Sequence, residues 1–383
     1  MNTQSPRQSP RFAGRGFNKT GRKKTALVLA GGGFPAYMYE IGCLTALDDF
    51  FCDGFSTNDF DIYVGTSAGA AVTALVANGV KPRRIYEDIG ADHDSVFNFR
   101  RKDIYSFGIH ETLPMLKKLF KSLLPILRLY YSNRHQFSAL DLFYMLQENL
   151  PSGIFTLKNL DHYLSAFFSQ TGYTNDFRRL RKDLYIPGVD IDTGRYDVFG
   201  EGEFADVPIS LAVTASSAMP IAFQPVHIRG KDYVDGGVGR AAHVDIAINH
   251  GAEICLIINP TYPVINDRNK ACITSFSGQC AGIKDKGMSF IFDQALRANT
   301  QTRIYMSVKR YQAEHPDKDF LMIQPDPTET VMFLANVISM TAKLEVLHYG
   351  YTSTARMLRE NFALYEECFA KLGIKVTTDR FRE

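Results

Sequence analysis

The sequence predicts an α/β protein with a mostly parallel central sheet flanked by helices. Short apolar runs alternate along the chain with longer segments that have helical periodicity. Two of these runs pass directly through a glycine-rich turn into a helix, which is the pattern of a strand–helix unit. Strands that alternate with helices form parallel sheets covered on both faces, so we expect this architecture for most of the chain.

The first strand–helix unit contains three successive glycines. An apolar strand is predicted at 25–30, and Gly31, Gly32 and Gly33 follow it before a helix over Tyr37–Phe50. The free N–H groups of such a loop suit either the pyrophosphate of a dinucleotide or the oxyanion of an acyl-transfer reaction. A dinucleotide site needs an acidic residue at the end of the next strand, about 20 residues further on. The next strand lacks this residue, so an oxyanion hole is favoured over a nucleotide site or a tight turn without chemistry.

The second unit ends in a serine. A strand at 61–64 leads into the sequence GTSAG at residues 65–69, and a helix of small residues follows. In a G-x-S-x-G elbow the serine occupies a strained turn, and the flanking glycines leave room for the backbone. The hydroxyl is then exposed at a helix N-terminus, whose unpaired N–H groups favour negative charge. Ser67 is therefore the candidate nucleophile, with Gly65 and Gly69 as the elbow glycines.

A helical insertion is predicted over about residues 100–150. Within it, residues 112–131 form an amphipathic helix with an apolar face and a basic face beside it. Pro125 is expected to interrupt this helix, because proline removes a backbone donor. The apolar face can pack on the core, cover an active-site cleft or lie in a membrane interface. The apolar residues are Leu116, Phe120, Leu123, Leu124 and Leu127, and the basic residues are Lys117, Lys121 and Arg128.

The remaining segments continue the alternation of strands and helices. Asp235 closes a short strand and precedes Gly236 and Gly237, so its carboxylate is either a functional group on a loop rim or part of an ordinary turn. We predict strands at 183–190, 196–199, 223–228, 232–234, 254–259 and 320–324, and helices at 159–168, 207–217, 289–311 and 341–370, the last as one helix or two.

Composition places the chain among ordinary globular proteins. It has 383 residues, 45% of them hydrophobic and 22% charged, and a net charge of +2, which gives no reason to expect a nucleic-acid partner. No apolar run is long enough for a transmembrane helix, and no secretory signal is recognised. The six cysteines show no C-x-x-C spacing, so reduced thiols and a cytoplasmic or peripheral membrane location are expected. The sequence favours no oligomeric state.

Residues 1–24 form a basic tail without an acidic residue, in which Ser, Pro, Gly and Gln fill the gaps. Such a composition is typical of disorder. The tail can contact an anionic surface or remain a solvated segment without a specific role. Its basic residues are Arg7, Arg11, Arg15, Lys19, Arg22, Lys23 and Lys24.

The glycine loop, the serine elbow and the Asp-Gly-Gly sequence occur in an order that resembles the patatin-like phospholipase family, in its bacterial type of lipid acyl hydrolase. The resemblance extends to 151–155, 190–194, 215–220 and 223–225, and it covers about residues 25–370. It implies a fold related to the α/β-hydrolases. Residues 25–383 would then form a single catalytic domain, with the helical insertion as a lid.

The resemblance also implies a mechanism. Ser67 would attack a lipid ester carbonyl, and Asp235 would take the serine proton directly, as a dyad without histidine. Backbone N–H groups of the Gly31–Gly33 loop would hold the oxyanion. No metal or organic cofactor is implied. The partner would be a lipid or membrane-surface substrate, with peripheral contact through residues 1–24 and 112–131.

The sequence departs from the family directly after the glycine loop. Where family members have a basic residue and a further glycine, this chain reads Phe34-Pro35-Ala36-Tyr37. Proline removes a backbone donor and fixes φ. The change therefore predicts a displaced oxyanion hole or the loss of a basic contact with the lipid head group, and hence weak activity or an unusual substrate.

Three alternatives to a Ser–Asp hydrolase follow from the same sequence. The order Ser, Asp, His of an α/β-hydrolase triad is available, because four histidines follow Asp235. An inactive or weakly active lipid-binding scaffold would keep the fold and lose the reaction. A nucleotide-binding protein would use the Gly31–Gly33 loop for phosphate. The histidines in question are His243, His250, His315 and His348.

Overall fold

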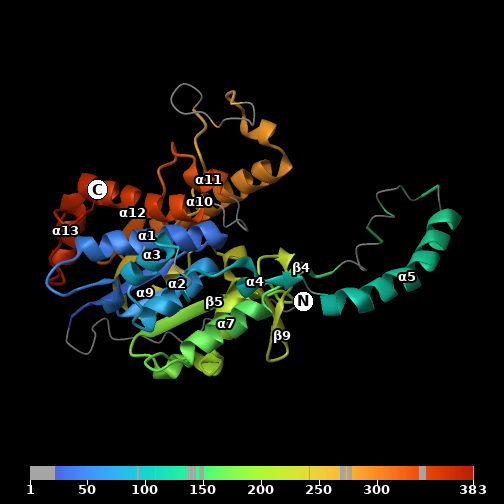
Figure 1. The fold of residues 1–383 in the computed structure, drawn as a ribbon, viewed down its shortest axis with the longest axis horizontal. Coiled ribbons are helices and arrows are strands. Elements are labelled where there is room, and N and C mark those ends of the chain that lie inside the picture. Colours follow the sequence, from blue (N-terminus) through green and yellow to red (C-terminus); the bar gives the residue numbers. More distant parts are fainter. Residues whose placement is uncertain are drawn as a thin grey trace.

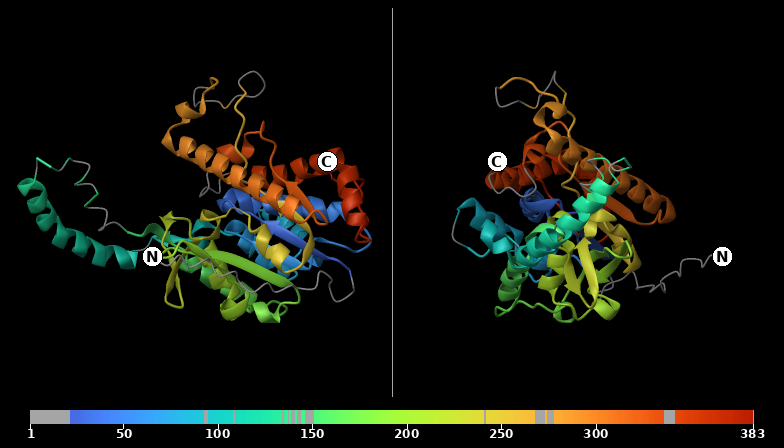
Figure 2. Two further views of the ribbon diagram at one scale, coloured as in Figure 1. Left: turned by 180° about the vertical axis from the view of Figure 1, so that it is seen from behind. Right: turned by 90° about the vertical axis from the view of Figure 1, so that its right-hand side faces the viewer.

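The structure is a computed structural model of the protein. It describes residues 22–92, 95–107, 109–133, 135–136, 138, 141, 144–145, 151–240, 242–267, 273, 278–335 and 342–382. Helices lie on both faces of a central sheet, and one long helix extends away from this body (Figures 1 and 2).

The main sheet is mostly parallel, which confirms the predicted fold class. Its strands are β1 (Lys24–Leu29), β2 (Ile62–Gly65), β5 (Asp183–Asp190), β6 (Arg195–Phe199), β8 (Val226–Ile228), β9 (Lys231–Asp235), β10 (Ala252–Ile258) and β11 (Asp319–Ile323). Over the described residues their order is β11-β10-β1-β2-β5-β9-β8, and β6 also pairs with β5. The first five strands in this order are parallel, whereas β6, β8 and β9 pair antiparallel.

A smaller sheet contains β3 (Ser106–Phe107), β4 (Gly153–Thr156) and β7 (Ile221–Phe223). The predicted strand at 223–228 is therefore wrong in one respect, since it divides into β7 and β8 in different sheets. Gln224 and Pro225 separate the two strands, and proline cannot donate to a strand ladder.

The helices cover both faces of the main sheet. Side chains alternate along β1, so Leu27 and Leu29 face one helical layer while Ala26 and Val28 face the other. The helices are α1 (Gly33–Phe50), α2 (Ala68–Ala77), α3 (Pro82–Gly90), α4 (Arg101–Ile104), α5 (Ile109–Ser132), α7 (Lys158–Phe168), α8 (Ile209–Ser216), α9 (Val244–Asn249), α10 (Met288–Glu314), α11 (Val331–Leu334), α12 (Lys343–Glu360) and α13 (Phe362–Ala370). The first layer includes α1, α2, α3 and α12 (Figure 1), and the second includes α9 and α10, which Figure 2 shows from behind.

Helices α1 and α12 cross with their backbones in close contact. A Cβ at Gly42 in α1 would overlap the carbonyl oxygen of Leu347, and a Cβ at Gly350 in α12 would overlap that of Tyr39. Only glycine at both positions allows this approach. Because α1 begins at the glycine loop, the crossing also fixes the loop's position over the sheet.

Strands β2 and β9 lie along the same edge of β5. Successive residues of a strand direct their backbone N–H and C=O groups to opposite edges of the strand. The donors next to β2 and to β9 both belong to odd-numbered residues, so both neighbours lie along the same edge. The Asp183 N–H donates to the Asp61 carbonyl before β2, and the Ile191 N–H donates to the Asp232 carbonyl in β9. β2 is parallel to β5 and β9 is antiparallel, so the two strands run toward each other. Their C-terminal ends meet, which brings the residues after β2 next to Asp235.

Helix α5 differs from its prediction. It is a single helix that continues through Pro125 and begins at Ile109, so the expected interruption is wrong. A proline inside a helix removes one hydrogen bond and can bend the helix without ending it. The helix extends away from the body in both views (Figures 1 and 2), and its Phe120 and Leu124 side chains are exposed. The structure therefore places α5 apart from the core, and its role as a lid stays a prediction.

The N-terminal boundary also changes. Residues 1–21 of the predicted tail lie outside the described residues, as do several positions of the predicted insertion. Arg22 is already part of the fold, because its guanidinium pairs with Asp61 at 3.2 Å, and Lys24 begins β1. Within the described residues, no helix has the length and apolarity needed to cross a membrane.

The expectation of reduced thiols throughout is wrong. Cys280 is disulfide-bonded, whereas Cys43, Cys52, Cys255 and Cys368 are free. Cysteine spacing along a sequence does not determine which cysteines meet in space, so no local pattern indicated this bond.

Candidate active site

Ser67 lies in the turn between β2 and α2. Its backbone has φ 56° and ψ −126°, a conformation that residues with a Cβ rarely adopt. Such a conformation costs about 1–3 kcal/mol and persists only where the surroundings hold it. Here the Ser67 N–H donates to the Ser216 hydroxyl on α8 at 3.1 Å, and α2 begins at the next residue. The turn therefore has the strained strand–helix geometry of a nucleophile elbow.

The two glycines of the elbow are required by close packing. A Cβ at Gly65 would overlap the first turns of α2, and a Cβ at Gly69 would lie 2.7 Å from the Leu29 carbonyl oxygen at the end of β1. Both glycines thus let α2 approach the sheet. The same packing brings the elbow to the glycine loop, since a Cβ at Gly31 would lie 2.9 Å from the Ser67 Cβ.

Asp235 ends β9 beside this turn. Its carboxylate accepts a hydrogen bond from the Gly237 N–H at 2.8 Å, and the neighbouring Ser67 side chain lowers the pKa of this carboxyl. A Cβ at Gly237 would lie 3.1 Å from the Asp235 Oδ1, and a Cβ at Gly236 would overlap the Pro187 carbonyl. The two glycines therefore let the chain turn back over its own carboxylate and hold it toward the serine.

Burial changes the acid–base character of Asp235. The residue is 7% exposed, and burial raises the pKa of its carboxyl from 3.8 to about 6, because removal from water disfavours the ionised form. The Ser67 side chain and the Gly237 N–H lower this pKa, since they stabilise the carboxylate. At neutral pH the group is mostly ionised yet more basic than an ordinary aspartate, which suits a general base.

Helix α8 and the turn after it hold both residues. The Ser216 hydroxyl accepts the Ser67 N–H, and the Ala218 carbonyl accepts the Asp235 N–H at 3.0 Å. Sequence reasoning singled out residues 215–220 only through the family resemblance and missed this role. The signal was the run of small residues at 215–218, which lets the α8 turn lie under the elbow and the aspartate.

The glycine loop is packed directly against the elbow. Gly31, Gly32 and Gly33 have φ values of 72°, 138° and 73°, which other residues rarely adopt. A Cβ at Gly31 would overlap the Thr66 carbonyl oxygen, and a Cβ at Gly32 would meet the Thr261 side chain. Glycine is thus required at these positions for both conformation and space.

Gly31 does not offer a free N–H, which corrects the prediction that all three glycines hold an oxyanion. Its N–H donates to the Glu40 Oε1 at 3.1 Å. The reason is that a carboxyl buried in α1 needs a donor, and the loop supplies it. The N–H groups of Gly32 and Gly33 have no acceptor in the part of the chain that the structure describes. These two groups and the N-terminus of α1 remain available to a negative charge.

Sequence reasoning missed Glu40. This residue is fully buried, and burial raises the pKa of its carboxyl well above the usual range, which favours the neutral acid. Its Oε2 has no hydrogen-bond partner among the described residues. The signal for a buried polar contact was an acidic residue within the largely apolar residues 33–47 of α1, since the other acidic residues of this helix, Asp48 and Asp49, lie in its last turn.

Pro35 removes no hydrogen bond from α1. Because α1 begins at Gly33, Pro35 lies in the first turn, where N–H groups have no intrahelical acceptor and proline loses no bond. Phe34, which replaces the basic residue of the family, packs near Tyr37 and Phe99 with ring centroids 6.4 and 5.9 Å away. The basic contact is therefore replaced by an aromatic cluster beside the loop.

The four histidines of a possible triad lie in other surroundings. The His243 Nε2 lies 3.1 Å from the Gly236 carbonyl oxygen, and burial lowers the pKa of its imidazole. His250 contacts Glu201, His348 lies near Tyr86, and His315 directly follows the C-terminus of α10. Within the described residues, no hydrogen bond joins a histidine to Ser67 or Asp235. Over the same residues, no three His, Cys, Asp or Glu side chains are grouped so as to hold a metal ion.

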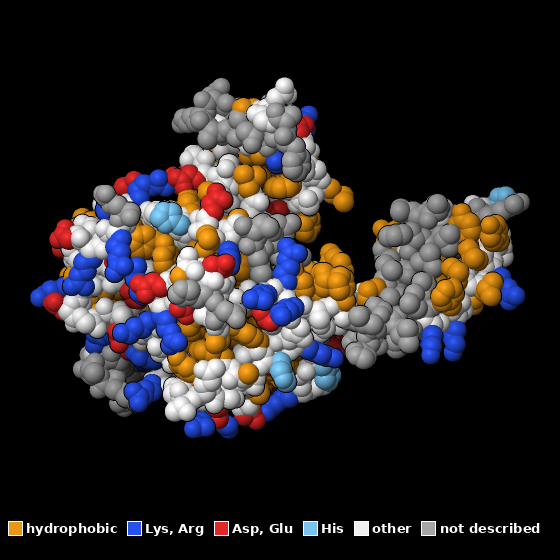
Figure 3. Space-filling view, in the orientation of Figure 1, with side chains coloured by type: hydrophobic (Ala, Val, Ile, Leu, Met, Phe, Trp, Pro, Cys, Tyr) orange, Lys and Arg blue, Asp and Glu red, His pale blue; other side chains and the backbone are white. Residues whose placement is uncertain are grey.

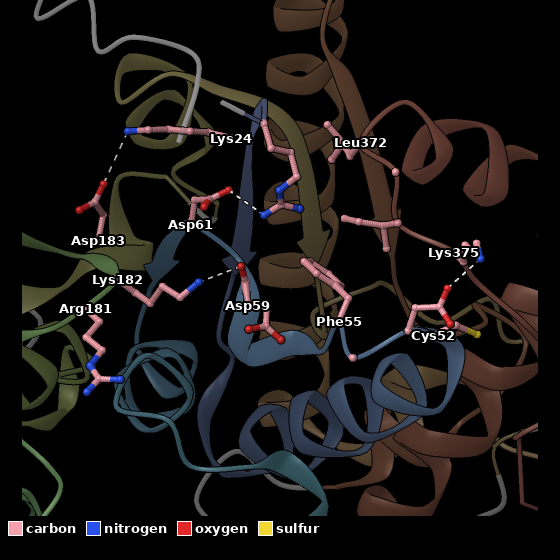
Figure 4. A pocket seen from close by; sticks show the side chains of 15 residues that line it. Lys24, Cys52, Phe55, Asp59, Asp61, Arg181, Lys182, Asp183, Leu372 and Lys375 are labelled. Carbon is pink, nitrogen blue, oxygen red and sulfur yellow. Dashed lines mark hydrogen bonds and ion pairs between the residues drawn. The ribbon is translucent and has the colours of Figure 1, made fainter. Parts of the chain in front are cut away.

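A charged cavity of about 710 Å³ lies at the opposite end of the sheet (Figure 4). Strands β1, β2 and β5 begin beside it, whereas the site residues follow the ends of β1 and β2. Several of its charges are paired, including Arg22 with Asp61 at 3.2 Å and Lys24 with Asp183 at 3.7 Å. This cavity is therefore separate from the Ser–Asp pair.

Comparisons with known proteins add independent information. Residues 27–248, which include the glycine loop, the elbow and the Asp-Gly-Gly turn, match the family described as patatin-like phospholipase. The chain is 21% identical over 224 residues to the probable lipid hydrolase 463L of Invertebrate iridescent virus 6, covering 58% of this chain and 63% of that protein. The chain thus spans less than two thirds of this relative. It is also similar to the crystal structure of VipD from Legionella pneumophila, with a TM-score of 0.40 and 16% identity, over 90% of this chain and 69% of that one.

Proposed function

Because the chain belongs to the patatin-like phospholipase family, we propose that it is a serine lipid acyl hydrolase that cleaves ester bonds of phospholipids or related lipids. The observation that carries the proposal is the position of Ser67 at a strained turn, beside the buried Asp235 carboxyl, whose pKa the Ser67 side chain lowers. The printed name of the viral relative, a probable lipid hydrolase, supports a lipid substrate.

The proposed reaction passes through an acyl-enzyme. The Ser67 Oγ attacks the ester carbonyl carbon while Asp235 accepts the hydroxyl proton. The N–H groups of Gly32 and Gly33 hold the negative charge that develops on the carbonyl oxygen. The C–O bond to the alcohol then breaks, and Asp235 returns the proton to the leaving oxygen. A water molecule attacks the acyl ester with Asp235 again as base, which releases the fatty acid and restores the serine.

Peripheral contact with a lipid surface is part of the proposal. Residues 112–131 within α5 support it, because exposed Phe120 and Leu124 lie on the same helix as Lys117 and Lys121. A helix with an apolar face and neighbouring cations is suited to a membrane interface. The basic sequence at 1–24 would add attraction to anionic lipid.

A fluorophosphonate probe tests the nucleophile, and a lipid panel tests the substrate. The wild-type protein should react with the probe and should hydrolyse at least one of phosphatidylcholine, lysophosphatidylcholine and triacylglycerol. Both activities should disappear in Ser67→Ala, whereas His348→Ala, as a control from the alternative triad, should retain them. A folded wild-type protein that neither reacts with the probe nor hydrolyses any lipid would favour the inactive scaffold.

The contact between Glu40 and Gly31 makes a prediction about the glycine loop. Glu40→Ala removes the acceptor of the Gly31 N–H and leaves a cavity beside the loop, so the neighbouring donors should lose their alignment. Since loss of one oxyanion donor typically costs about 10²–10³-fold in rate, we expect kcat on a soluble ester to fall about 10- to 100-fold with little change in KM.

Glu40→Gln is the matched control for this positioning role. The glutamine amide keeps an oxygen that can accept the Gly31 N–H, and burial already favours the uncharged form of Glu40 by raising its pKa. We therefore expect kcat close to that of the wild type. If Glu40→Ala folds and keeps the wild-type kcat, Glu40 does not position the loop.

A further inference from the structure

Two groups of exposed apolar side chains flank the candidate active site. The first, here called the α10 lip, lies on the N-terminal half of α10, where Met288 is 85% and Phe292 64% exposed. The second, called the sheet lip, lies on the small sheet, where Phe107 is 67% and Ile221 76% exposed. The α10 lip also includes Ile291 and Leu296, and the sheet lip also includes Ile154. Figure 3 shows hydrophobic side chains on both sides of a notch, on the side from which α5 extends.

The α10 lip is linked to the glycine loop by a short series of contacts. Gly32 packs against Thr261, whose hydroxyl donates to the Asn259 Oδ1 at 2.9 Å. Three residues further on, Val264 exchanges two hydrogen bonds with the Gln294 side chain in α10, at 3.2 and 2.8 Å. Met288 lies about 9 Å before Gln294 along the helix, at 1.5 Å per residue. The lip therefore continues outward from the oxyanion side of the site.

The sheet lip is linked to the aspartate in the same way. The Ala218 carbonyl accepts the Asp235 N–H, and Ile221 follows three residues later. Ile221 has φ 74°, which is an outlier for a β-branched residue. An exposed isoleucine gains no burial in the described structure that would offset this strain, so the strain points to a function for its exposed side chain.

Charge around the lips is mainly positive. Lys284 lies just before the α10 lip, and Arg101, Lys102 and Lys158 lie beside the strands of the sheet lip, all with solvent-accessible side chains. Nearby carboxylates are fewer than these cations, and one of them is neutralised by an arginine. Asp103 accepts the Arg100 N–H at 2.8 Å, Asp285 accepts the Gly282 N–H at 2.7 Å, and Asp293 pairs with Arg297 at 2.7 Å. Apolar side chains bordered by accessible cations match the surface of an anionic bilayer.

We propose that the α10 lip and the sheet lip insert together into an anionic phospholipid bilayer and place the Ser67 site at its surface. The substrate ester would then enter between the lips without leaving the membrane, and α5 would lie on the same surface. This inference rests on the proposed function for the identity of the substrate, although membrane binding itself can be measured without catalysis.

The test is sedimentation with vesicles made of three parts phosphatidylcholine and one part phosphatidylglycerol. The variants are Phe292→Ser in the α10 lip and Ile221→Asn in the sheet lip, since asparagine tolerates positive φ. The matched control is Leu364→Ser, which replaces an exposed leucine of α13 at the far end of the body. Loss of one buried aromatic or aliphatic group should weaken vesicle partitioning about tenfold, and both together about a hundredfold. The control should bind as the wild type, and vesicles of phosphatidylcholine alone should bind more weakly.

Activity separates this inference from the proposed function. The ratio of vesicle-lipid hydrolysis to soluble-ester hydrolysis should fall in both lip variants. A protein that hydrolyses neither substrate but binds vesicles through the lips would reject the proposed function and keep the inference. Wild-type binding in the folded double variant would overturn the inference. A dimer that dissociates in Ile221→Asn without any vesicle binding would also overturn it, because the lips would then be a subunit interface.

Discussion

Replacing Ser67 with glycine is expected to abolish ester hydrolysis and at the same time to make the protein more stable. Without the hydroxyl there is no acyl-enzyme, and loss of a serine nucleophile lowers activity by at least about 10⁴-fold. Glycine adopts φ 56° and ψ −126° without the clash that a Cβ creates. Relief of part of the strain of about 1–3 kcal/mol should raise the free energy of unfolding by about 1 kcal/mol. Urea denaturation and kcat/KM on a soluble ester measure the two effects.

Ser67→Ala separates these two effects. Alanine also lacks the hydroxyl but keeps the Cβ, so it should lose hydrolysis without the gain in stability. Equal free energies of unfolding for the glycine and alanine variants would show that the elbow is not strained. Hydrolysis by either variant at the wild-type rate would show that another group is the nucleophile.

Replacing Asp235 with asparagine should lower activity and raise stability in a way that depends on pH. Asparagine has the same shape and can still accept the Gly237 N–H, but it cannot accept the serine proton. We expect kcat/KM to fall about 10³-fold, the middle of the range for loss of a general base. In the wild type, kcat/KM should rise with pH and level off above about 6, because the base must be ionised and its pKa is raised to about 6.

The stability effect follows from the same raised pKa. Between the unfolded pKa of 3.8 and the folded value of about 6, the folded protein holds a proton that the unfolded chain has released. The wild type therefore loses stability as pH rises through this window, up to about 3 kcal/mol. The asparagine of the variant does not titrate, so the stability advantage of Asp235→Asn should be small below pH 4, grow up to about pH 6 and then remain constant. Thermal unfolding over this range measures the difference, and a constant difference at all pH values would contradict the raised pKa.

The parts of the fold and of the site that could be predicted are those that the local sequence determines. Glycine and serine at fixed spacing between a strand and a helix specify the elbow, because the required backbone conformation excludes most other residues. The strand at 254–259 is similarly local, since a short and almost continuous apolar run is typical of a buried parallel strand. The helix at 289–311 was predicted to within three residues at each end.

The parts that could not be predicted depend on which groups meet in space. The hydrogen bond from the Gly31 N–H to Glu40 could not be predicted, because the local sequence does not show that α1 is buried on all sides. Whether Pro35 removes a hydrogen bond from α1 depends on where this helix begins, and no local pattern shows that it begins at Gly33. The position of α5 away from the body depends on the absence of a packing partner among the described residues, whereas its amphipathic pattern is the same for a helix on the core and one in a membrane.

The crossing of α1 and α12 has a consequence for where this protein can be cut. The segment that matches the family ends at residue 248, but β10, β11 and α12 all lie beyond it. A truncation there would turn β1 into an unprotected edge strand and would strip the apolar cover from the helix that carries Gly42. The segment that matches the family is thus shorter than the part of the chain that must fold together. We expect the residues after 248 to be needed, like the sequence motifs, to hold Ser67 in its position.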